Sequence, residues 1–402
     1  DTYYQAETAR CDNYTFDWNK TQAGWYRQWI DLPEGISGKK AVLHFDAVAK
    51  AAHVWINGQY AASHVGMFGD FDVDATPYLH PGKNLVAVKV IRNVLAKKAD
   101  DAEITAVAVT IPVTKEMLRD VPHGFHYTCP PAGIWQPVKL VFTQPLKIED
   151  VFIQPSLEGA KFDMTVSNPS RAKFEVLTEI TDTRTGSVLW SGRSVAACKD
   201  TVCTWSLDGL KPCLWSPEHP NLYDFKFTLR SKGREADALI ITSGFRTFER
   251  KGEFLYLNSH RYWLRGGNHI PSALAPNDAT LAESFMTIMH NAHVDVTRTH
   301  CAPWNEVWMD AADRVGIGVS HEGGWPWLMI TGDIPSEEAL RIWREEEYDL
   351  VRKYRNHPSL LFWTINNEMN FYEWDQDKDR TRKKYVIVSG VVRKIRQIDP
   401  TR

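Results

Sequence analysis

The sequence predicts a multidomain β plus α/β fold: a jelly-roll β-sandwich, an immunoglobulin-like β-sandwich, and then the first half of a (β/α)8 TIM barrel. Short β-rich runs separated by regular turns fill roughly the first 245 of the 402 residues. Beyond that point the apolar period changes from two to that of a helix. A chain of this length also exceeds one ordinary core. We therefore expect domains at residues 1–145, 146–245 and 246–402.

The two N-terminal segments carry the strand signals. In the first, residues 41–45 and 86–90 are β-rich runs, and Asn57-Gly58 between apolar neighbours predicts a type I′ hairpin. Many short strands with regular turns are typical of a jelly roll. In the second, roughly 100 residues of alternating or apolar runs match the size of an immunoglobulin-like sandwich. Neither sandwich shows a cluster of catalytic residue types.

The third segment alternates strand and helix signals. Thr280-Leu281-Ala282-Glu283 has the pattern of a capping box, and Gly316 is expected to end a later helix. Helical apolar stripes lie at residues 280–289, 304–315, 340–354 and 388–398, and strand candidates at residues 262–265, 294–297, 318–320 and 360–366. Strand and helix thus alternate four times, as in the first half of an α/β barrel.

A carboxylate follows the most apolar of these strand candidates. Residues 360–366 are mostly apolar, which is typical of a strand buried on both faces, and Asn367-Glu368 comes directly after them. Barrel enzymes keep their chemistry at the C-terminal ends of such strands. Glu368 is therefore a candidate catalytic residue; the alternative is that it is simply the first solvated residue after a strand.

The composition narrows the range of partners. Hydrophobic residues make up 43% of the chain and charged residues 24%, and the net charge of -3 offers no attraction for nucleic acid or an anionic membrane. No apolar run is long enough to span a bilayer. The chain has 16 tryptophans, whose flat faces suit the apolar faces of sugar rings. We expect no nucleic acid and no membrane as partners.

The cysteines and the N-terminal region give weaker indications. The 6 cysteines show no C-x-x-C pair and no zinc spacing, and we expect no metal or other cofactor. Cys198, Cys203 and Cys213 are close enough in sequence to form a disulfide, but their pairing stays open. Asn13 and Asn19 begin glycosylation sequons, so a secreted or periplasmic location is favoured over a cytoplasmic one.

The domain order and several spaced motifs together resemble glycoside hydrolase family 2, the family of β-galactosidases, β-glucuronidases and β-mannosidases. The resemblance covers essentially the whole chain. Its motifs are Gly133-Ile134-Trp135-Gln136-Pro137-Val138, Gly244-Phe245-Arg246, Leu264-Arg265-Gly266-Gly267-Asn268-His269, Arg298-Thr299-His300, Ala312-Asp313-Arg314-Val315-Gly316 with Glu322, and Asn356-His357-Pro358-Ser359 with Trp363 and Asn367-Glu368.

This resemblance implies an exo-acting retaining β-glycosidase that hydrolyses terminal galactosides, glucuronides or mannosides. Glu368 would be the general acid/base, Asn367 would hydrogen-bond the sugar 2-hydroxyl, and Arg298 would orient catalytic carboxylates. The residues that would line the sugar pocket are His300, Asn268, His269, Glu322 and Trp325. The family's nucleophile is a glutamate on a later barrel strand and has no counterpart here. We therefore expect a fragment or one part of an assembly, inactive alone, with its open edges covered by an oligomer or by the remainder of the barrel.

Several alternatives remain open at this point. A non-catalytic carbohydrate-binding protein, a degenerate barrel, or an enzyme of another barrel family would show the same strand and helix pattern. Arg298 could pair structurally with any acidic residue, and Trp325 could pack within its loop. The histidines near the barrel strands lack an H-x-x-x-H spacing, so packing or sugar binding is favoured over metal binding. The run Glu345-Glu346-Glu347 is expected to be a solvated helix face.

Overall fold

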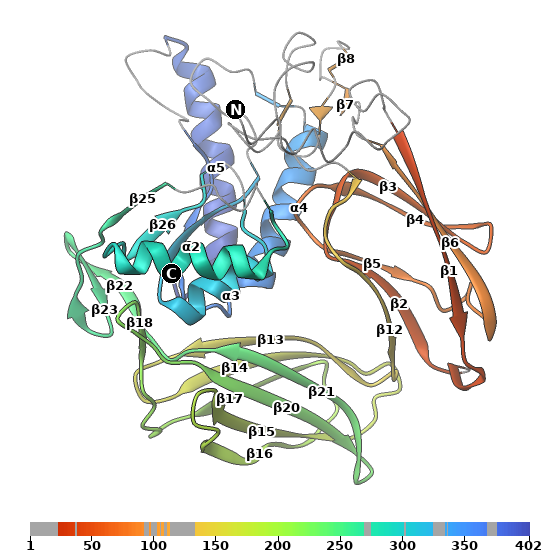
Figure 1. The fold of residues 1–402 in the computed structure, drawn as a ribbon, viewed down its shortest axis with the longest axis horizontal. Coiled ribbons are helices and arrows are strands. Elements are labelled where there is room, and N and C mark those ends of the chain that lie inside the picture. Colours follow the sequence, from red (N-terminus) through yellow and green to blue (C-terminus); the bar gives the residue numbers. More distant parts are fainter. Residues whose placement is uncertain are drawn as a thin grey trace.

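The structure is a computed structural model that describes residues 23–36, 38–91, 96–97, 103–104, 106–107, 111–112, 133–268, 275–300, 303–324, 334–335, 337–367 and 376–402. Two β-sandwiches flank a group of helices that packs on a small parallel sheet (Figure 1). This order confirms the predicted fold class of jelly roll, immunoglobulin-like sandwich and barrel strands. In the described part of the chain, no helix has the length and apolarity needed to cross a membrane.

The jelly roll packs two antiparallel sheets over one apolar core. One sheet has the order β1 (Ala23–Leu32), β6 (Gly82–Ile91), β3 (Val48–Ile56), β11 (Gly133–Ile134), with β4 (Gln59–Gly66) also paired to β3, and the other has the order β12 (Val138–Thr143), β2 (Lys40–Phe45), β5 (Phe71–Asp74). Shorter elements are η2 (Glu34–Ile36), β7 (Ala96–Lys97), β8 (Glu103–Ile104), β9 (Ala106–Val107) and β10 (Ile111–Pro112). The predicted hairpin is confirmed, because Asn57 and Gly58 join β3 to β4 with φ values of 51° and 80°.

A charged trio around His44, on the central strand of the second sheet, leads to a pH prediction. The two ring nitrogens of His44 lie 3.0 Å from Asp46 and 2.7 Å from Asp72, and these hydrogen bonds raise the pKa of His44 to about 9. In the unfolded chain the histidine titrates near its ordinary pKa of 6.5. The resulting stabilisation is fully present below pH 6.5 and is lost as the pH rises through 9.

We expect His44→Gln to destabilise the jelly roll by about 2 kcal/mol at pH 6.5, after allowance for solvent screening, and by little at pH 10. The measurement is the midpoint of thermal unfolding of both proteins between pH 6 and 10. The matched control is His80→Gln. His80 is an exposed histidine whose Nδ1 lies 2.8 Å from the Pro81 carbonyl rather than from a carboxylate. A difference between wild type and His44→Gln that does not change with pH would contradict the prediction.

The immunoglobulin-like sandwich also consists of two antiparallel sheets. One contains β13 (Lys147–Pro155), β14 (Ala160–Ser167) and β17 (Val202–Leu207); the other contains β16 (Val188–Cys198), β15 (Phe174–Asp182), β20 (Tyr223–Ser231) and β21 (Arg234–Ser243). Phe162, Phe225 and Phe227 are fully buried between the sheets. The sulfurs of Cys198 and Cys203 lie 3.1 Å apart, and both residues, like Cys213, are free thiols.

Short antiparallel pairs lead from this sandwich into the barrel strands. They are β18 (Trp215–Ser216) with β19 (His219–Pro220), and β22 (Phe248–Lys251) with β23 (Phe254–Leu257) and β24 (His260–Arg261). A parallel sheet follows in the order β25 (Gly266–Asn268), β26 (Val296–Arg298), β27 (Gly318–Glu322), β28 (Leu360–Thr364). Its helices are α2 (Ala279–Asn291), α3 (Glu306–Val315), α4 (Glu337–Tyr354) and α5 (Lys378–Ile398). Gly316 ends α3 in the left-handed conformation, as predicted.

Two local predictions in this region were wrong. The first barrel strand lies at Gly266–Asn268, within the motif at residues 264–269 that the resemblance gives for it, rather than at residues 262–265; Gly266 permits the close pairing, because a Cβ there would lie 1.8 Å from the Val296 carbonyl oxygen of β26. Trp263, within the predicted strand, is 79% exposed. Helix α2 is capped by Asp278 rather than by Thr280, since the Asp278 carboxylate accepts a 2.9 Å hydrogen bond from the Leu281 N–H.

The immunoglobulin-like sandwich is joined to the start of β28 by a network of hydrogen bonds. The Asn356 side chain accepts from the Ile153 N–H at 2.9 Å and donates to the Val151 carbonyl at 2.8 Å. The buried Arg246 donates to the carbonyls of Pro358 at 2.9 Å and Leu360 at 2.5 Å. These contacts fix the position at which β28 enters the parallel sheet.

The jelly roll is joined to α4 through a buried carboxylate. One oxygen of Glu346 accepts hydrogen bonds from the backbone N–H groups of Met67 at 2.6 Å, Phe68 at 2.7 Å and Gly69 at 3.0 Å. The predicted solvated face of α4 was therefore wrong: Glu346 is 6% exposed and Glu347 2%. Only Glu345 of this run lies at the surface, where it pairs with Arg341 at 2.7 Å.

Candidate active site

The C-terminal ends of three parallel strands bring together side chains that are far apart in the sequence. Arg298 ends β26, Glu322 ends β27, and Asn367 follows β28. One terminal nitrogen of Arg298, Nη2, lies 2.7 Å from Glu322 Oε2 and also donates to Asn367 Oδ1 at 2.7 Å. Arg298 thus bridges a carboxylate and an amide at the end of the sheet where α/β barrels place their chemistry.

Alternation along β27 explains why Glu322 faces this end of the sheet. Val319 and His321 pack toward the helices, where the His321 Nε2 lies 3.1 Å from the Trp304 carbonyl. Burial lowers the pKa of His321 to about 4, so the ring is neutral. The intervening Ser320 and Glu322 lie on the opposite face, and the Ser320 hydroxyl lies 2.7 Å from that of Thr364 on β28.

Glu322 is held at both its backbone and its side chain. Its N–H donates to the Thr299 hydroxyl at 2.9 Å, and its side chain, only 2% exposed, pairs with Arg298. A carboxylate this deeply buried needs such a partner to remain ionised. Asn367 is also buried, and its Nδ2 has no hydrogen-bond partner in the part of the chain that the structure describes, so this donor is available to a ligand.

The other predicted site residues are placed as follows. Asn268 ends β25, is paired in register with Arg298, and is exposed. His300 comes two residues after β26 and is half-buried, with φ of 48° in the left-handed region. Glu368, His269 and Trp325 lie outside the described residues. Among the predicted residues, the structure therefore brings Arg298, Glu322 and Asn367 into direct contact.

A second buried acid behind Glu322 was missed by sequence reasoning. Glu347 packs so tightly against Gly323 that a Cβ there would lie 1.8 Å from Glu347 Oε1. Burial, followed by the nearby charges of Glu346 and Glu322, raises the pKa of Glu347 well above its ordinary value. Glu347 thus packs directly against the turn after β27. The glycine pair Gly323-Gly324 was the available signal for this close packing.

Comparison with known proteins adds independent information about this arrangement. Three family profiles match the chain in order: "Glycosyl hydrolases family 2, sugar binding domain" over residues 10–113, "Glycosyl hydrolases family 2" over residues 146–246, and "Glycosyl hydrolases family 2, TIM barrel domain" over residues 249–402. Their order agrees with the order of the sandwiches and the parallel sheet.

Curated relatives and solved structures give the same result. A β-glucuronidase of Paenibacillus borealis is 28% identical over 366 residues, and a β-galactosidase of Thermoanaerobacter pseudethanolicus is 25% identical over 385 residues. These matches cover 86% and 90% of this chain but 58% and 47% of the relatives, so the chain spans about half their length. The crystal structure of a Bacteroides uniformis β-glucuronidase has the same fold, with a TM-score of 0.75 at 22% identity over 95% of this chain and 46% of that one.

Proposed function

Because this chain belongs to glycoside hydrolase family 2, we propose that the intact protein is an exo-acting retaining β-glycosidase. The names of the relatives support a β-glucuronide or a β-galactoside as substrate over a β-mannoside. Glu368 is the proposed general acid/base, and the proposed nucleophile is a second carboxylate outside these 402 residues.

The single observation that carries this proposal is the Arg298 bridge between Glu322 and Asn367. It fixes Asn367 at the end of the sheet, and Glu368 is the next residue along the chain. A glycosidic oxygen is a poor leaving group, so an acid at this place must protonate it as the bond breaks. The Asn367 Nδ2 would donate to the 2-hydroxyl, a contact that strengthens as positive charge develops on the sugar.

The remaining predicted residues have supporting roles in this proposal. Arg298 keeps Glu322 ionised and in place, since a positive charge 2.7 Å away favours the carboxylate form. The residues at the ends of the neighbouring strands β25, β26 and β27 would bind sugar hydroxyls. They are Asn268, His300 and Glu322, and His269 and Trp325 would join them. The acid needs a raised pKa to stay protonated near neutrality, and an ionised nucleophile close by would supply it.

The test is hydrolysis by the intact purified protein of aryl β-glucuronides, β-galactosides and β-mannosides. We expect turnover of one of the first two. Proton NMR of the first product should show the β-anomer, since retention requires two displacements. Exo-action predicts release of single sugars from the non-reducing end of an oligosaccharide. A first product with inverted configuration would refute the mechanism, and no turnover of any glycoside would refute the enzyme proposal.

The bridging role of Arg298 predicts the effect of a conservative replacement. Arg298→Lys keeps the charge, but the shorter lysine side chain does not hold its nitrogen at the position from which Nη2 contacts both Glu322 and Asn367. We expect kcat/KM to fall about 30-fold, equivalent to about 2 kcal/mol of lost charged hydrogen bonding. The control is Arg314→Lys, which changes an exposed ion pair with Glu283 at 3.7 Å. Equal activities of the two variants would show that the bridge is only structural.

A second candidate function is carbohydrate binding without turnover. The observation that favours it is an exposed aromatic row on the jelly roll, in which the Trp25 and Trp55 rings lie 5.0 Å apart and the Trp55 and Tyr60 rings 5.4 Å. Trp25 is 56% exposed. Such faces stack on sugar rings. Saturable oligosaccharide binding that is weakened by Trp25→Ala, in a protein that hydrolyses no glycoside, would favour this candidate.

A further inference from the structure

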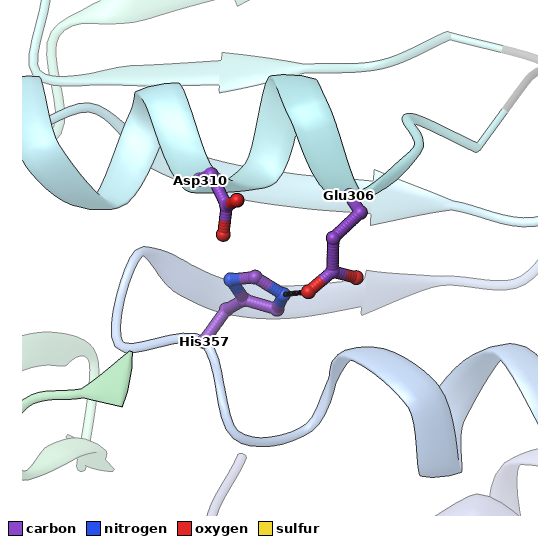
Figure 2. A group of neighbouring side chains, drawn as sticks. All are labelled: Glu306, Asp310 and His357. Carbon is purple, nitrogen blue, oxygen red and sulfur yellow. Dashed lines mark ion pairs between the residues drawn. The ribbon is translucent and has the colours of Figure 1, made fainter. Parts of the chain in front are cut away.

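A cluster of metal-ligating side chains lies away from the candidate active site, between α3 and the turn before β28. Glu306 and Asp310 are four residues apart on one face of α3, and His357 approaches them from the turn (Figure 2). One ligand atom from each residue lies within 4.8 Å of the other two. We call these three residues the α3–His357 cluster. Neither the family resemblance nor the proposed hydrolysis gives them a role.

We propose that the α3–His357 cluster binds a divalent transition metal ion, such as Zn²⁺ or Mn²⁺. His357 Nε2 lies 3.6 Å from Glu306 Oε1, which is beyond hydrogen-bond distance. Two ligands that each lie about 2.1 Å from a shared ion are about 3.0–3.4 Å apart at the angles found in octahedral and tetrahedral sites. This ion pair is therefore only slightly wider than two ligands of one ion, and a small movement of the exposed Glu306 side chain would bring both atoms to metal distance.

The orientation of the histidine is a second, independent observation. His357 is 6% exposed, and its Nδ1 lies 2.6 Å from one oxygen of the buried Asp313. The other Asp313 oxygen accepts from the Ser359 N–H at 2.9 Å, so the carboxylate cannot rotate freely. A metal-binding histidine commonly donates its second ring nitrogen to a carboxylate in this way. Asp313 thus directs Nε2 toward the cluster.

The charge balance of the cluster favours a cation. Glu306, Asp310 and Asp313 place three carboxylates around His357, which pairs with Glu306 and Asp313 and offsets at most one of the three negative charges. Two basic side chains lie in the neighbourhood but contact other acids: Lys353 lies 3.8 Å from Asp70, and Arg314 lies 3.7 Å from Glu283. A dication would offset the excess of negative charge. The exposed Glu306 leaves a route for the ion and room for water ligands.

The donor set identifies the class of metal. One imidazole nitrogen with two carboxylate oxygens suits Zn²⁺ or Mn²⁺, whereas Ca²⁺ and Mg²⁺ prefer oxygen ligands throughout. The ion would tie helix α3 to the turn that begins β28, so its expected effect is on stability rather than on chemistry. Sequence reasoning predicted no metal because the histidine is distant in sequence from both acids and forms no recognised spacing.

The test uses the intact protein after removal of metals with a chelator, titrated with ZnCl₂, MnCl₂ and MgCl₂ by calorimetry and by thermal unfolding. We expect one Zn²⁺ or Mn²⁺ site and a rise of roughly 2–4 °C in the unfolding midpoint. Glu306→Gln and Asp310→Asn should each weaken binding at least about tenfold. Glu306 is exposed and Asp310 is half-buried, so circular dichroism of the metal-free variants checks their folding.

The matched control is Glu283→Gln, an exposed acid on α2 that should leave metal binding unchanged. Absence of Zn²⁺ and Mn²⁺ binding to the wild-type protein would overturn the proposal. Binding that persists unchanged in the Glu306→Gln, Asp310→Asn double variant would also overturn it, as would a preference for Mg²⁺. Hydrolytic activity is not a readout here, so the outcome is independent of the proposed glycosidase function.

Discussion

Replacing Glu368 by Gln in the intact protein is expected to lower kcat about 10³-fold for β-glycosides with poor leaving groups. Glutamine has nearly the same size and can still hydrogen-bond the glycosidic oxygen, but it cannot protonate that oxygen. Substrates with dinitrophenyl leaving groups need no such protonation, so the first chemical step on them should be slowed far less. The measurement is kcat and kcat/KM for a series of glycosides that differ only in the pKa of the leaving group.

The pH profile adds a second readout to this experiment. The wild-type rate should fall at alkaline pH as the acid loses its proton, and the Glu368→Gln variant should lose that alkaline limb. Glu345→Gln is the matched control, since Glu345 is an exposed acid paired with Arg341 at 2.7 Å on the surface of α4. A Glu368→Gln enzyme with wild-type rates on poor leaving groups would exclude Glu368 as the proton donor.

The second large effect is expected at the joint between α4 and the jelly roll. Glu346→Ala removes the acceptor shared by the N–H groups of Met67, Phe68 and Gly69, all of which are buried. Each buried donor without a partner costs about 1–3 kcal/mol, and the relief of burying one carboxylate offsets part of the sum. We expect a net loss of about 3–4 kcal/mol, measured as a lower midpoint of thermal unfolding.

Two further variants separate this joint from a general effect of helix substitution. Glu345→Ala, one residue earlier on the same helix, should change stability by less than about 0.5 kcal/mol because its side chain is exposed. Glu346→Gln keeps an acceptor oxygen and should recover more than half of the loss. If Glu346→Ala and Glu345→Ala are equally stable, the three backbone hydrogen bonds contribute nothing to the fold.

Much of the fold could be predicted because its signals are local. The Asn57-Gly58 turn, the left-handed Gly316 and the apolar run that became β28 each depend on neighbours along the chain. The first barrel strand could not be placed correctly from the same kind of signal. Gly266 has no side chain to contribute to a pattern, and its strand pairs with β26, which follows only after helix α2.

In the candidate site, too, some residues could be predicted from the sequence and others could not. Resemblance to a family selected Arg298, Glu322 and Asn367, and the structure places these three in contact. The buried acids of α4 were misjudged because three consecutive charges on a helix normally face water. The groups that need Glu346 lie on the jelly roll, 277 to 279 residues away in sequence. No local pattern can report a partner at that separation.

The hydrogen bonds around Asn356 limit how this architecture can be cut and recombined. Val151 and Ile153 of the sandwich both hydrogen-bond to the side-chain amide of Asn356, which lies in the turn before β28. The sandwich is therefore not a detachable spacer, because removing it would leave the Asn356 amide without these two partners. A chimaera that borrows the sandwich of a relative must carry over the matching turn as well, so that the two are exchanged as one module.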